Sequence, residues 1–369
     1  MVCHMFSRLR FAASVALLVT GCASGSPASP TATAVAPSLV PSPSPTETTT
    51  PTPTASAAAE PLIAAALSAS GPAAREDHTW TVAADGATAL LFGGRDGATV
   101  HGDLWSYDLE ADAWTQLEPG PGPAARFGHE AAWLDGIGLV IFAGQAGADF
   151  FDDLWAYDPG SNAWRQLPSS GATPVPRYGT CSAVAPDGRL WISHGFTSDG
   201  ARFSDTRAYD FATGEWTDES PSSGARPVER CLHACWWTDA GGLTLYAGQT
   251  TDVTALGDRW TFTDGAWTQL EGALPPDRNL YGRTRLAGAT LVFGGQALDG
   301  SFLGDLWLLR DDALDAEQLE PEGEALPGRA GGELILDAQR ERVLLFGGRN
   351  DDGSHGDLWE LRGVVPDSG

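Results

Sequence analysis

Hydrophobic and polar positions repeat along this chain with a period near 50 residues. Each unit has an aliphatic run that ends in Gly, then a polar loop, then Asp-x-Trp. The runs end at Gly93-Gly94, Ala143-Gly144, His194-Gly195, Ala247-Gly248, Gly294-Gly295 and Gly347-Gly348. The Asp-x-Trp segments begin at Asp103, Asp153, Asp205, Asp258, Asp305 and Asp357, with Arg207 replacing Trp in the third. Six units of this length predict one four-stranded sheet per unit.

The second unit shows the pattern of the four strands. A first strand is predicted over residues 126–133, entered from a Pro/Gly-rich loop. The wholly apolar run 139–144 predicts a second strand covered on both faces. Residues 153–158 alternate in polarity like a third strand, and residues 163–167 follow a turn and predict the fourth. Four short strands in this order predict an antiparallel sheet.

The combined motifs resemble the kelch repeat: Arg-x-x-His, aliphatic-aliphatic-Phe-Gly-Gly, Asp-x-Trp-x-Tyr-Asp and Trp-x-x-Leu. The resemblance covers residues 60–369 and implies an all-β, six-bladed β-propeller with each first strand beside a central channel. The recurrent Asp is expected to fix a turn through bonds to the backbone. Two Trp columns are expected to fill the space between blades: Trp105, Trp155, Trp260, Trp307 and Trp359, and Trp114, Trp164, Trp216 and Trp267.

Closure of the ring is predicted from the two ends of the repeat region. The sixth unit ends after Trp359 without a fourth strand. Residues 62–66 precede the segment that leads to Arg75 as residues 114–117 precede the one that leads to Arg126, which puts Ile63 in a Trp column. We therefore expect residues 61–67 to form the outer strand of the last blade and to cover its open edge.

The N-terminal residues predict a targeting signal and a tether. Arg8 and Arg10 precede a short apolar run, and residues 19–22 resemble the lipobox of bacterial lipoproteins. This resemblance implies a signal peptide over residues 1–21 and lipid attachment at Cys22; an ordinary signal peptide is the alternative. Residues 22–59 are rich in Ser, Thr and Pro and predict a disordered tether. The expected location is the bacterial cell envelope, outside the cytoplasm and lipid-anchored.

Composition limits the possible chemistry. The chain contains 22 Arg and no Lys, which excludes lysine-based catalysis and a Walker phosphate loop. A net charge of −26 argues against a nucleic-acid partner. We expect a monomer that needs no cofactor.

Three cysteines lie in the first strands of the third and fourth units. Cys231, His233 and Cys235 alternate along one strand, but residues i and i+4 of a strand lie about 13 Å apart and cannot share one zinc ion. Cys181 is one column from Cys235 in the neighbouring strand. A disulfide from Cys181 to Cys235 or Cys231, or three buried thiols, remain open alternatives, and we expect no metal.

One arginine opens each first strand: Arg75, Arg126, Arg177, Arg230, Arg278 and Arg329. Six guanidinium groups at a channel mouth are suited to bind an anion; alternatively, each pairs with a local carboxylate or carbonyl. His78, His129 and His233 follow three residues later and are expected to line the channel. Their absence from the other units argues against a shared catalytic role.

The loops between second and third strands vary most and are the expected binding surface. The first column after each Gly pair is Arg95, Gln145, Phe196, Gln249, Gln296 and Arg349. The column before the third strands contains His101, Phe151, Phe203 and His355, with Leu256 and Leu303 in the other units. Aromatic rings beside Gln and Arg suit a sugar or peptide; packing of the Phe rings on their own blades is the alternative.

No hydrolase, zinc-protease or phosphate-binding signature is found in the sequence. We therefore expect a binding protein that presents its loops to a protein or glycan partner. The alternative is a carbohydrate-active enzyme that uses the channel mouth, because the kelch resemblance extends to galactose oxidase and sialic-acid mutarotases. The copper site of the oxidase is not recognisable in this sequence.

Overall fold

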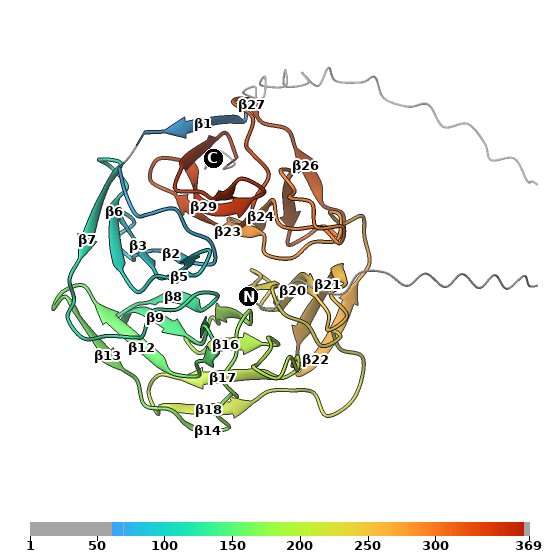
Figure 1. The fold of residues 1–369 in the computed structure, drawn as a ribbon. Helices are drawn as coiled ribbons and strands as arrows, with labels where there is room; N and C mark the ends of the chain where they lie inside the picture. The colour runs from blue at the N-terminus through green and yellow to red at the C-terminus, as the bar shows by residue number, and fades with distance from the viewer. Residues whose placement is uncertain (1–60, 69, 365–369) are drawn as a thin grey trace, which may run out of the picture. The chain divides into compact units, whose positions relative to one another are not determined.

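A computed structural model of the chain describes residues 61–68 and 70–364. Six β-sheets stand around one axis in these residues (Figure 1), which confirms the predicted six-bladed propeller. Each sheet is a blade, and its strands lie side by side in order from the axis to the rim.

The blades follow the six sequence units, and the strands of each blade are named in order from the axis outward. Blade 1 contains β2 (Thr79–Val82), β3 (Thr88–Phe92), β6 (Leu104–Asp108) and β7 (Ala113–Leu117). Blade 2 contains β8 (Glu130–Leu134), β9 (Gly138–Phe142), β12 (Leu154–Asp158) and β13 (Ala163–Gln166). Blade 3 contains β15 (Cys181–Val184), β16 (Leu190–Ser193), β17 (Thr206–Asp210), β18 (Glu215–Asp218) and β14 (Ser170–Gly171).

The second half of the ring has the same plan. Blade 4 contains β19 (Ala234–Trp237), β20 (Leu243–Gln249), β21 (Ala255–Thr263) and β22 (Ala266–Leu270). Blade 5 contains β23 (Gly282–Leu286), β24 (Ala289–Phe293), β25 (Leu306–Arg310) and β26 (Glu317–Leu319). Blade 6 contains β28 (Ala330–Asp337), β29 (Arg342–Asn350), β31 (Leu358–Arg362), β1 (Ile63–Leu67) and β27 (Glu322–Gly323), with β30 (Gly353–Ser354) paired to β29. Short hairpins extend the loops of blades 1 and 2: β4 (Arg95–Asp96) with β5 (Thr99–Val100), and β10 (Gln145–Ala146) with β11 (Asp149–Phe150).

Blade 2 shows where the sequence pattern misplaced a strand boundary. Its innermost strand begins at Glu130 and not at Arg126. Gly128 has φ of +57°, which interrupts the extended backbone, and Phe127 pairs instead with Gln145 in a bridge. The residues between Arg126 and Glu130 therefore form a connection that precedes the antiparallel pairing of the blade.

Aromatic side chains fill the space between neighbouring blades, as predicted for the Trp columns. Trp164 of β13 packs on Phe92 of blade 1, with ring centroids 5.3 Å apart, and Trp216 of β18 packs on Phe142 of blade 2 at 5.1 Å. Trp216 is only 2% exposed. Burial of rings this large is a main source of cohesion between the blades.

The strand β1 closes the rim, as predicted, and we call it the rim clasp. It pairs antiparallel with β31 along all five of its residues. Ile63 does not occupy the Trp column, however, because the register pairs Ala64 with Leu361 as Trp114 pairs with Tyr107. Ala64 is 1% exposed, whereas Ile63 is 43% exposed.

A ring of backbone hydrogen bonds closes the axis. One residue per blade donates its N–H to the carbonyl of the equivalent residue in the preceding blade, over N···O distances of 2.7–3.3 Å. All six residues have φ between +52° and +67°. We call them the axis belt: Asp77, Gly128, Gly179, Leu232, Leu280 and Gly331.

Candidate functional site

The six arginines expected at the channel mouth are spokes inside the blades. All are at most 1% exposed. In blade 1, Arg75 donates from Nη1 and Nη2 to the Asp103 carboxylate at 2.7 and 2.9 Å, and from Nη1 to the Gly93 carbonyl at 2.8 Å. The same pairing recurs in every blade: Arg126–Asp153, Arg177–Asp205, Arg230–Asp258, Arg278–Asp305 and Arg329–Asp357. The arginines therefore offer no open ring for an anion, because their donors are already bonded.

The recurrent Asp serves this pairing, so its expected role in fixing a turn was wrong. Asp103 also accepts a hydrogen bond from Trp105 Nε1 at 2.7 Å. In blade 3, Arg207 replaces the Trp, and its Nε donates to Asp205 Oδ2 at 2.7 Å. Burial would raise the pKa of both carboxyls, but hydrogen bonds and the arginine charge hold it below its ordinary value.

Two of the three neighbouring cysteines are joined. Cys181 of β15 and Cys235 of β19 form a disulfide with a Cα–Cα distance of 5.5 Å, which links the innermost strands of blades 3 and 4. Cys231 keeps a buried free thiol. Burial raises the pKa of this thiol to about 11, so the thiol is inert at neutral pH.

The three histidines directly precede the first strands and line the cavity on the axis, as expected. They are 1–7% exposed, and the His129 ring meets Phe92 of the preceding blade edge to face at 5.3 Å. Burial lowers the pKa of His78 to about 3 and holds that of His129 and His233 well below the ordinary value. Neutral, enclosed rings have a packing role and do not act in general acid–base catalysis at pH 7.

The column before the third strands holds the spokes in place. The Phe151 carbonyl accepts the backbone N–H of Arg177 at 3.0 Å. The Phe151 ring lies under the Arg126 guanidinium with Cζ 4.0 Å from its centroid, and Phe203 lies under Arg177 at 4.4 Å. The His101 and His355 carbonyls accept in the same way from Arg126 and Arg75. These Phe rings thus pack on their own blades.

The first loop column surrounds the axis on the loop face, which is the side of the propeller that carries the loops between second and third strands. Each residue pairs through its backbone with the residue that follows a spoke arginine, as Arg95 does with Glu76. Gln145 and Gln296 use their side chains to brace their own loops. Phe196 meets Tyr178 edge to face, with centroids 5.1 Å apart. All six members are half-buried: Arg95, Gln145, Phe196, Gln249, Gln296 and Arg349.

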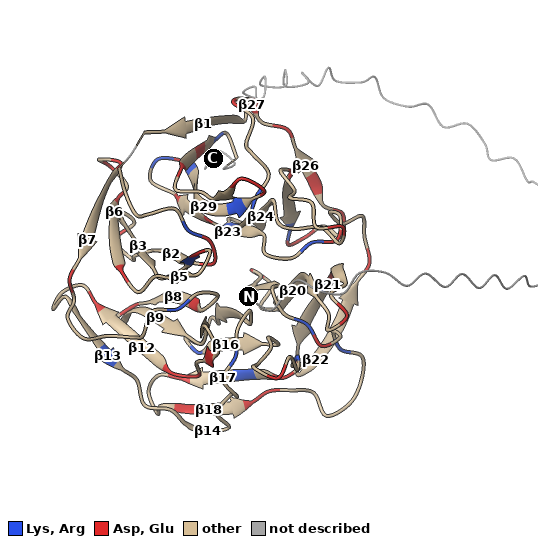
Figure 2. Cartoon of the chain, viewed as in Figure 1, with Lys and Arg blue, Asp and Glu red and all other residues tan. Residues whose placement is uncertain are grey.

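Four charged residues of blades 1 and 6 form one group, which we call the mouth cluster: Glu76, Asp77, Arg95 and Arg349. Glu76 forms ion pairs with Arg95, over 3.1 Å from Nε to Oε1, and with Arg349, over 2.5 Å from Nε to Oε2. Arg95 Nη2 lies 3.0 Å from Asp77 Oδ2, which also accepts from the Tyr178 hydroxyl at 3.1 Å. Figure 2 shows basic and acidic residues side by side on the loops near β5.

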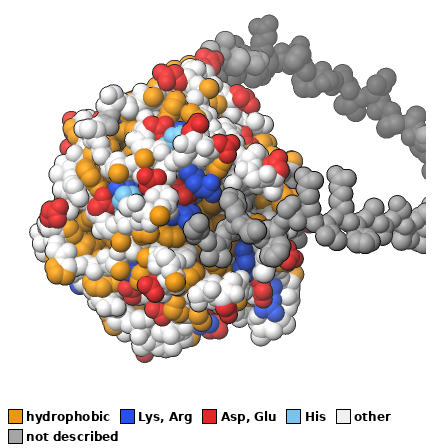
Figure 3. Space-filling view, in the orientation of Figure 1, with side chains coloured by type: hydrophobic (Ala, Val, Ile, Leu, Met, Phe, Trp, Pro, Cys, Tyr) orange, Lys and Arg blue, Asp and Glu red, His pale blue; other side chains and the backbone are white. Residues whose placement is uncertain are grey.

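The two arginines of the mouth cluster rest on aromatic rings. Arg95 Cζ lies 4.3 Å from the Phe127 centroid, and Arg349 Cζ lies 5.1 Å from that of Phe302. Their side chains are 27% and 29% exposed, whereas Glu76 is 6% exposed. Burial raises the pKa of Glu76 to about 7, and Asp77 adds to this effect while the two arginines oppose it. The loop face therefore presents cations over buried acids, and Figure 3 shows basic side chains near the middle of the viewed face.

The acidic half of this cluster was not predicted from the sequence. Glu76 and Asp77 follow Arg75 directly, where the other blades have residues of mixed type such as Phe127-Gly128. The available signal was the position directly after the arginine, because its residue varies between units while the arginine is present in all six. The pairing of Arg95 with Arg349 was not readable, because it depends on ring closure between the first and last blades.

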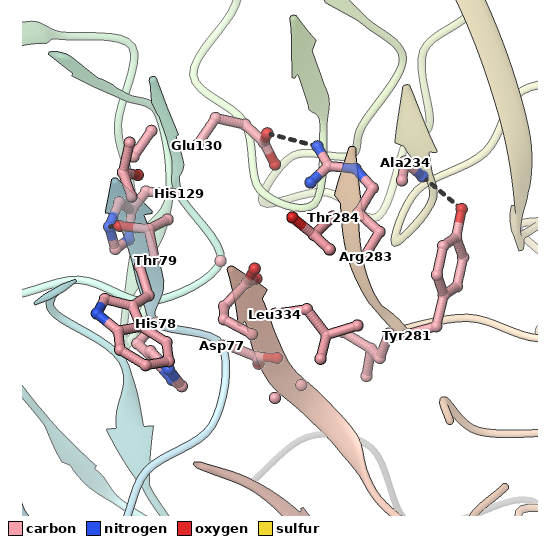
Figure 4. Close-up of a pocket in the computed structure, with 18 of the residues that line it drawn as sticks. Asp77, His78, Thr79, His129, Glu130, Ala234, Tyr281, Arg283, Thr284 and Leu334 are labelled. Carbon is pink, nitrogen blue, oxygen red and sulfur yellow. Dashed lines mark hydrogen bonds and ion pairs between the residues drawn. The ribbon is translucent and has the colours of Figure 1, made fainter. Parts of the chain in front are cut away.

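A cavity of about 380 Å³ lies on the axis and is lined by the belt and the first strands. Glu130 of β8 and Arg283 of β23 approach one another from opposite sides, with 3.9 Å between Glu130 Oε2 and Arg283 Nη2 (Figure 4). Ser182 donates to Glu130 Oε2 from its backbone N–H at 3.0 Å and its hydroxyl at 2.9 Å. Glu333 of β28 also lines the cavity.

Both glutamates of the cavity have perturbed acidity. Burial raises the pKa of Glu130 to about 7, against the opposing effects of Arg283 and the Ser182 hydrogen bonds. Burial raises the pKa of Glu333 to about 8, helped by Glu130 and Asp77 and opposed by Arg283. The cavity thus holds two carboxyls that titrate near neutral pH beside one permanent cation.

Within residues 61–68 and 70–364, no group of three or more His, Cys, Asp or Glu side chains is arranged to hold a metal ion. No helix formed by these residues is long and apolar enough to cross a bilayer. The expected signal peptide, the lipidation site Cys22 and the tether 22–59 lie outside the described residues.

Comparison with known proteins gives one result for the repeat region. Residues 62–248 match the family model described as the KLHDC2/KLHL20/DRC7 Kelch-repeats domain. The match begins at the rim clasp and runs through the first three blades into the second strand of the fourth. No curated protein matches the chain.

Proposed function

The chain belongs to the kelch-repeat family, and we propose that it is a binding protein that presents the loop face of its propeller to a protein or glycan partner. Kelch propellers typically serve as protein-interaction scaffolds. The mouth cluster is the observation that carries the proposal, because it places charged and aromatic groups together at the centre of this face.

The chemistry of the mouth cluster favours a partner that carries a carboxylate. Arg95 uses Nε in an ion pair with Glu76 and Nη2 in an ion pair with Asp77. Arg349 uses Nε in an ion pair with Glu76. The remaining terminal nitrogens belong to side chains more than a quarter exposed, held flat by the rings beneath them. Two guanidinium groups fixed in this way are pre-organised to donate to a planar anion.

Placement in the cell envelope is part of the proposal. It is supported by the lipobox-like segment that ends at Cys22 and by the disulfide between Cys181 and Cys235, since disulfides persist outside the reducing cytoplasm. Lipid attachment is tested by mass spectrometry of the protein from a producing cell. A Cys22→Ala variant that keeps the same lipid mass would contradict it.

The binding proposal is tested with the purified full-length protein on arrays of bacterial envelope proteins and glycans. We expect binding to at least one carboxylate-bearing component, and a loss of at least about tenfold in affinity in Arg95→Gln/Arg349→Gln. Arg310→Gln is the matched control, because Arg310 pairs with Glu317 on blade 5 away from the mouth cluster. The control should bind like the parent protein.

Loss of the two arginines also leaves Glu76 without its partners, so the melting temperature of each variant is measured in parallel. Arg349→Lys keeps the charge and loses the planar fork, and it should fold while binding more weakly. Equal binding by the parent protein, the double variant and Arg349→Lys would refute the role of the mouth cluster.

A further inference from the structure

The cavity on the axis contains polar groups that lack partners. Arg283 Nε is buried without a hydrogen-bond acceptor among the described residues, and the nearest carboxylate to its terminal nitrogens is Glu130 at 3.9 Å. No hydrogen bond or ion pair from a described residue reaches the carboxyl of Glu333. Arg283 Nε is the buried atom of the two groups, whereas Glu333 is partly buried. Because buried polar groups are nearly always bonded, Arg283 marks a place where a ligand can complete the network.

Arg283 is a permanent cation, Glu333 becomes an anion when its carboxyl ionises, and both line the cavity on the axis. Arg283 and Glu333 lie on neighbouring first strands, β23 and β28, and the Arg283 charge opposes the rise in the pKa of Glu333. The protein forms no direct ion pair between them within 4.0 Å, so a gap separates cation from anion. A ligand that carries both charges within a few ångströms fits this gap.

We propose that the cavity on the axis binds a small zwitterion of the α-amino acid class. Its carboxylate accepts hydrogen bonds from Arg283, and its ammonium group donates to Glu333 and to the free oxygen of Glu130. Asp77 of the mouth cluster also lines the cavity, but the proposed contacts come from the first strands of blades 2, 5 and 6 and not from the loops.

Charge balance selects a zwitterion over simpler ions. A simple anion would satisfy Arg283, but it would favour the protonated forms of the two nearby glutamates and would therefore take up protons on binding instead of releasing them. A simple cation would satisfy the glutamates and leave the guanidinium without an acceptor. Leu232, Leu280 and Leu334 also line the cavity and provide apolar contact for an amino acid side chain. The cavity of about 380 Å³ is within the size range of small-molecule sites.

Binding should release a proton. Glu333 has a pKa of about 8 in the empty cavity, so its carboxyl is mostly protonated at pH 7. An ammonium group beside it favours the ionised form and lowers this pKa, and the displaced proton leaves to solvent. The other charged groups that face Glu333 are Glu130, Asp77 and Arg283. Glu130 also titrates near pH 7 and adds to the release.

The test is a thermal-shift screen of the purified full-length protein with each proteinogenic L-amino acid at millimolar concentration, followed by calorimetry of the hits. We expect at least one amino acid to bind and to release protons at pH 7, seen as a dependence of the heat on buffer ionisation enthalpy. The N-acetyl derivative and the methyl ester of that amino acid lack one charge each, and both should bind at least about tenfold more weakly.

Two conservative variants assign the contacts. Arg283→Gln and Glu333→Gln should each weaken binding at least about tenfold, and Glu333→Gln should also reduce the proton release. Glu271→Gln, at an exposed position beyond β22, is the control and should change neither quantity. Melting temperatures without ligand verify that each variant folds.

The proposal is overturned if no amino acid shifts the melting temperature, or if both variants bind like the parent protein. Binding or turnover of a sugar acid in place of amino acids would also overturn it and would favour the carbohydrate-active alternative. Because Arg95 and Arg349 play no part in this cavity, Arg95→Gln/Arg349→Gln should keep amino acid binding, which separates this test from that of the mouth cluster.

Discussion

The ring is closed at two places, the axis belt and the rim clasp, and their chemistry differs. At the axis, every blade contributes one residue in a left-handed backbone conformation and one hydrogen bond to its neighbour. At the rim, a single strand that precedes the first blade pairs with the last. The axis closure is therefore distributed over six junctions, and the rim closure depends on five residues.

This difference predicts which of the two closures is more sensitive to mutation. One altered belt residue disturbs one junction of six, whereas loss of the clasp exposes a whole strand edge and the core beside Ala64. The axis is also reinforced by the Cys181–Cys235 disulfide, and the described part of the rim has no covalent link.

Deletion of residues 61–67 removes the rim clasp. At about 1 kcal/mol per ladder hydrogen bond, loss of five paired residues should cost about 5 kcal/mol and lower the melting temperature by about 10 °C or more. Calorimetry of the purified protein measures this. A seven-residue deletion at 31–37, in the segment predicted to be a tether, is the control and should leave the melt unchanged. An unchanged melt in the first variant would show that β1 does not close the ring.

Replacement of both disulfide cysteines by Ser should have the next largest effect. The bond encloses a sequence separation of 54 residues, for which loop entropy predicts a loss of about 4 kcal/mol. Urea unfolding with and without a reducing agent measures the difference, and the double variant should not respond to the reductant. Cys231→Ser should keep the response of the parent protein, because Cys231 is not in the bond.

Gly128→Ala tests one junction of the axis belt. Gly128 has φ of +57°, and an added Cβ would lie 1.8 Å from the Tyr178 ring. Backbone strain and the overlap together should cost about 3 kcal/mol. Gly97→Ala is the matched control, because Gly97 has φ of +55° with nothing within 4 Å of the added atom. It should cost about 1 kcal/mol. Equal losses in the two variants would remove the packing argument.

The pH dependence of stability tests the acidic group of the axial cavity. Glu333 in the folded protein keeps its proton up to a pKa of about 8, whereas in the unfolded chain it ionises near 4.5. The folded state binds more protons between these values, so this residue makes stability fall as pH rises from about 5 to 8. Glu333→Gln should flatten that part of the profile in urea unfolding. Glu271→Gln should follow the parent profile.

The fold was readable from the sequence because its determinants repeat. The missing fourth strand of the sixth unit and the apolar run at 62–66 predicted the rim clasp. The register was misjudged by one residue, because this run has no Trp to mark the buried face, and burial of Ala64 follows only from pairing with Leu361. The role of Asp205 was misread, although the sequence held a clue. Arg207 stands where other units have Trp, and both side chains have an N–H group that donates to the Asp two residues earlier.

The candidate sites were less predictable because they break the repeat. Arg95 and Arg349 were identified as loop residues, but their shared partner Glu76 depends on blades 1 and 6 meeting. Glu130 and Arg283 come from opposite blades. Glu130 has an equivalent only in Glu333 and Arg283 has none in the other blades, so no local pattern links them. The axis belt accepts Asp, Gly and Leu alike, since it needs a backbone conformation and not a side chain.

The position of the rim clasp gives the propeller a mechanical property. Tension applied from the N-terminal side of the chain enters the folded region through Ile63–Leu67, the same strand that holds the first blade to the last. A pull strong enough to strip this strand would open the ring at one seam and leave the six axial hydrogen bonds to hold it. The first element to bear load is therefore also the one whose loss breaks the circle.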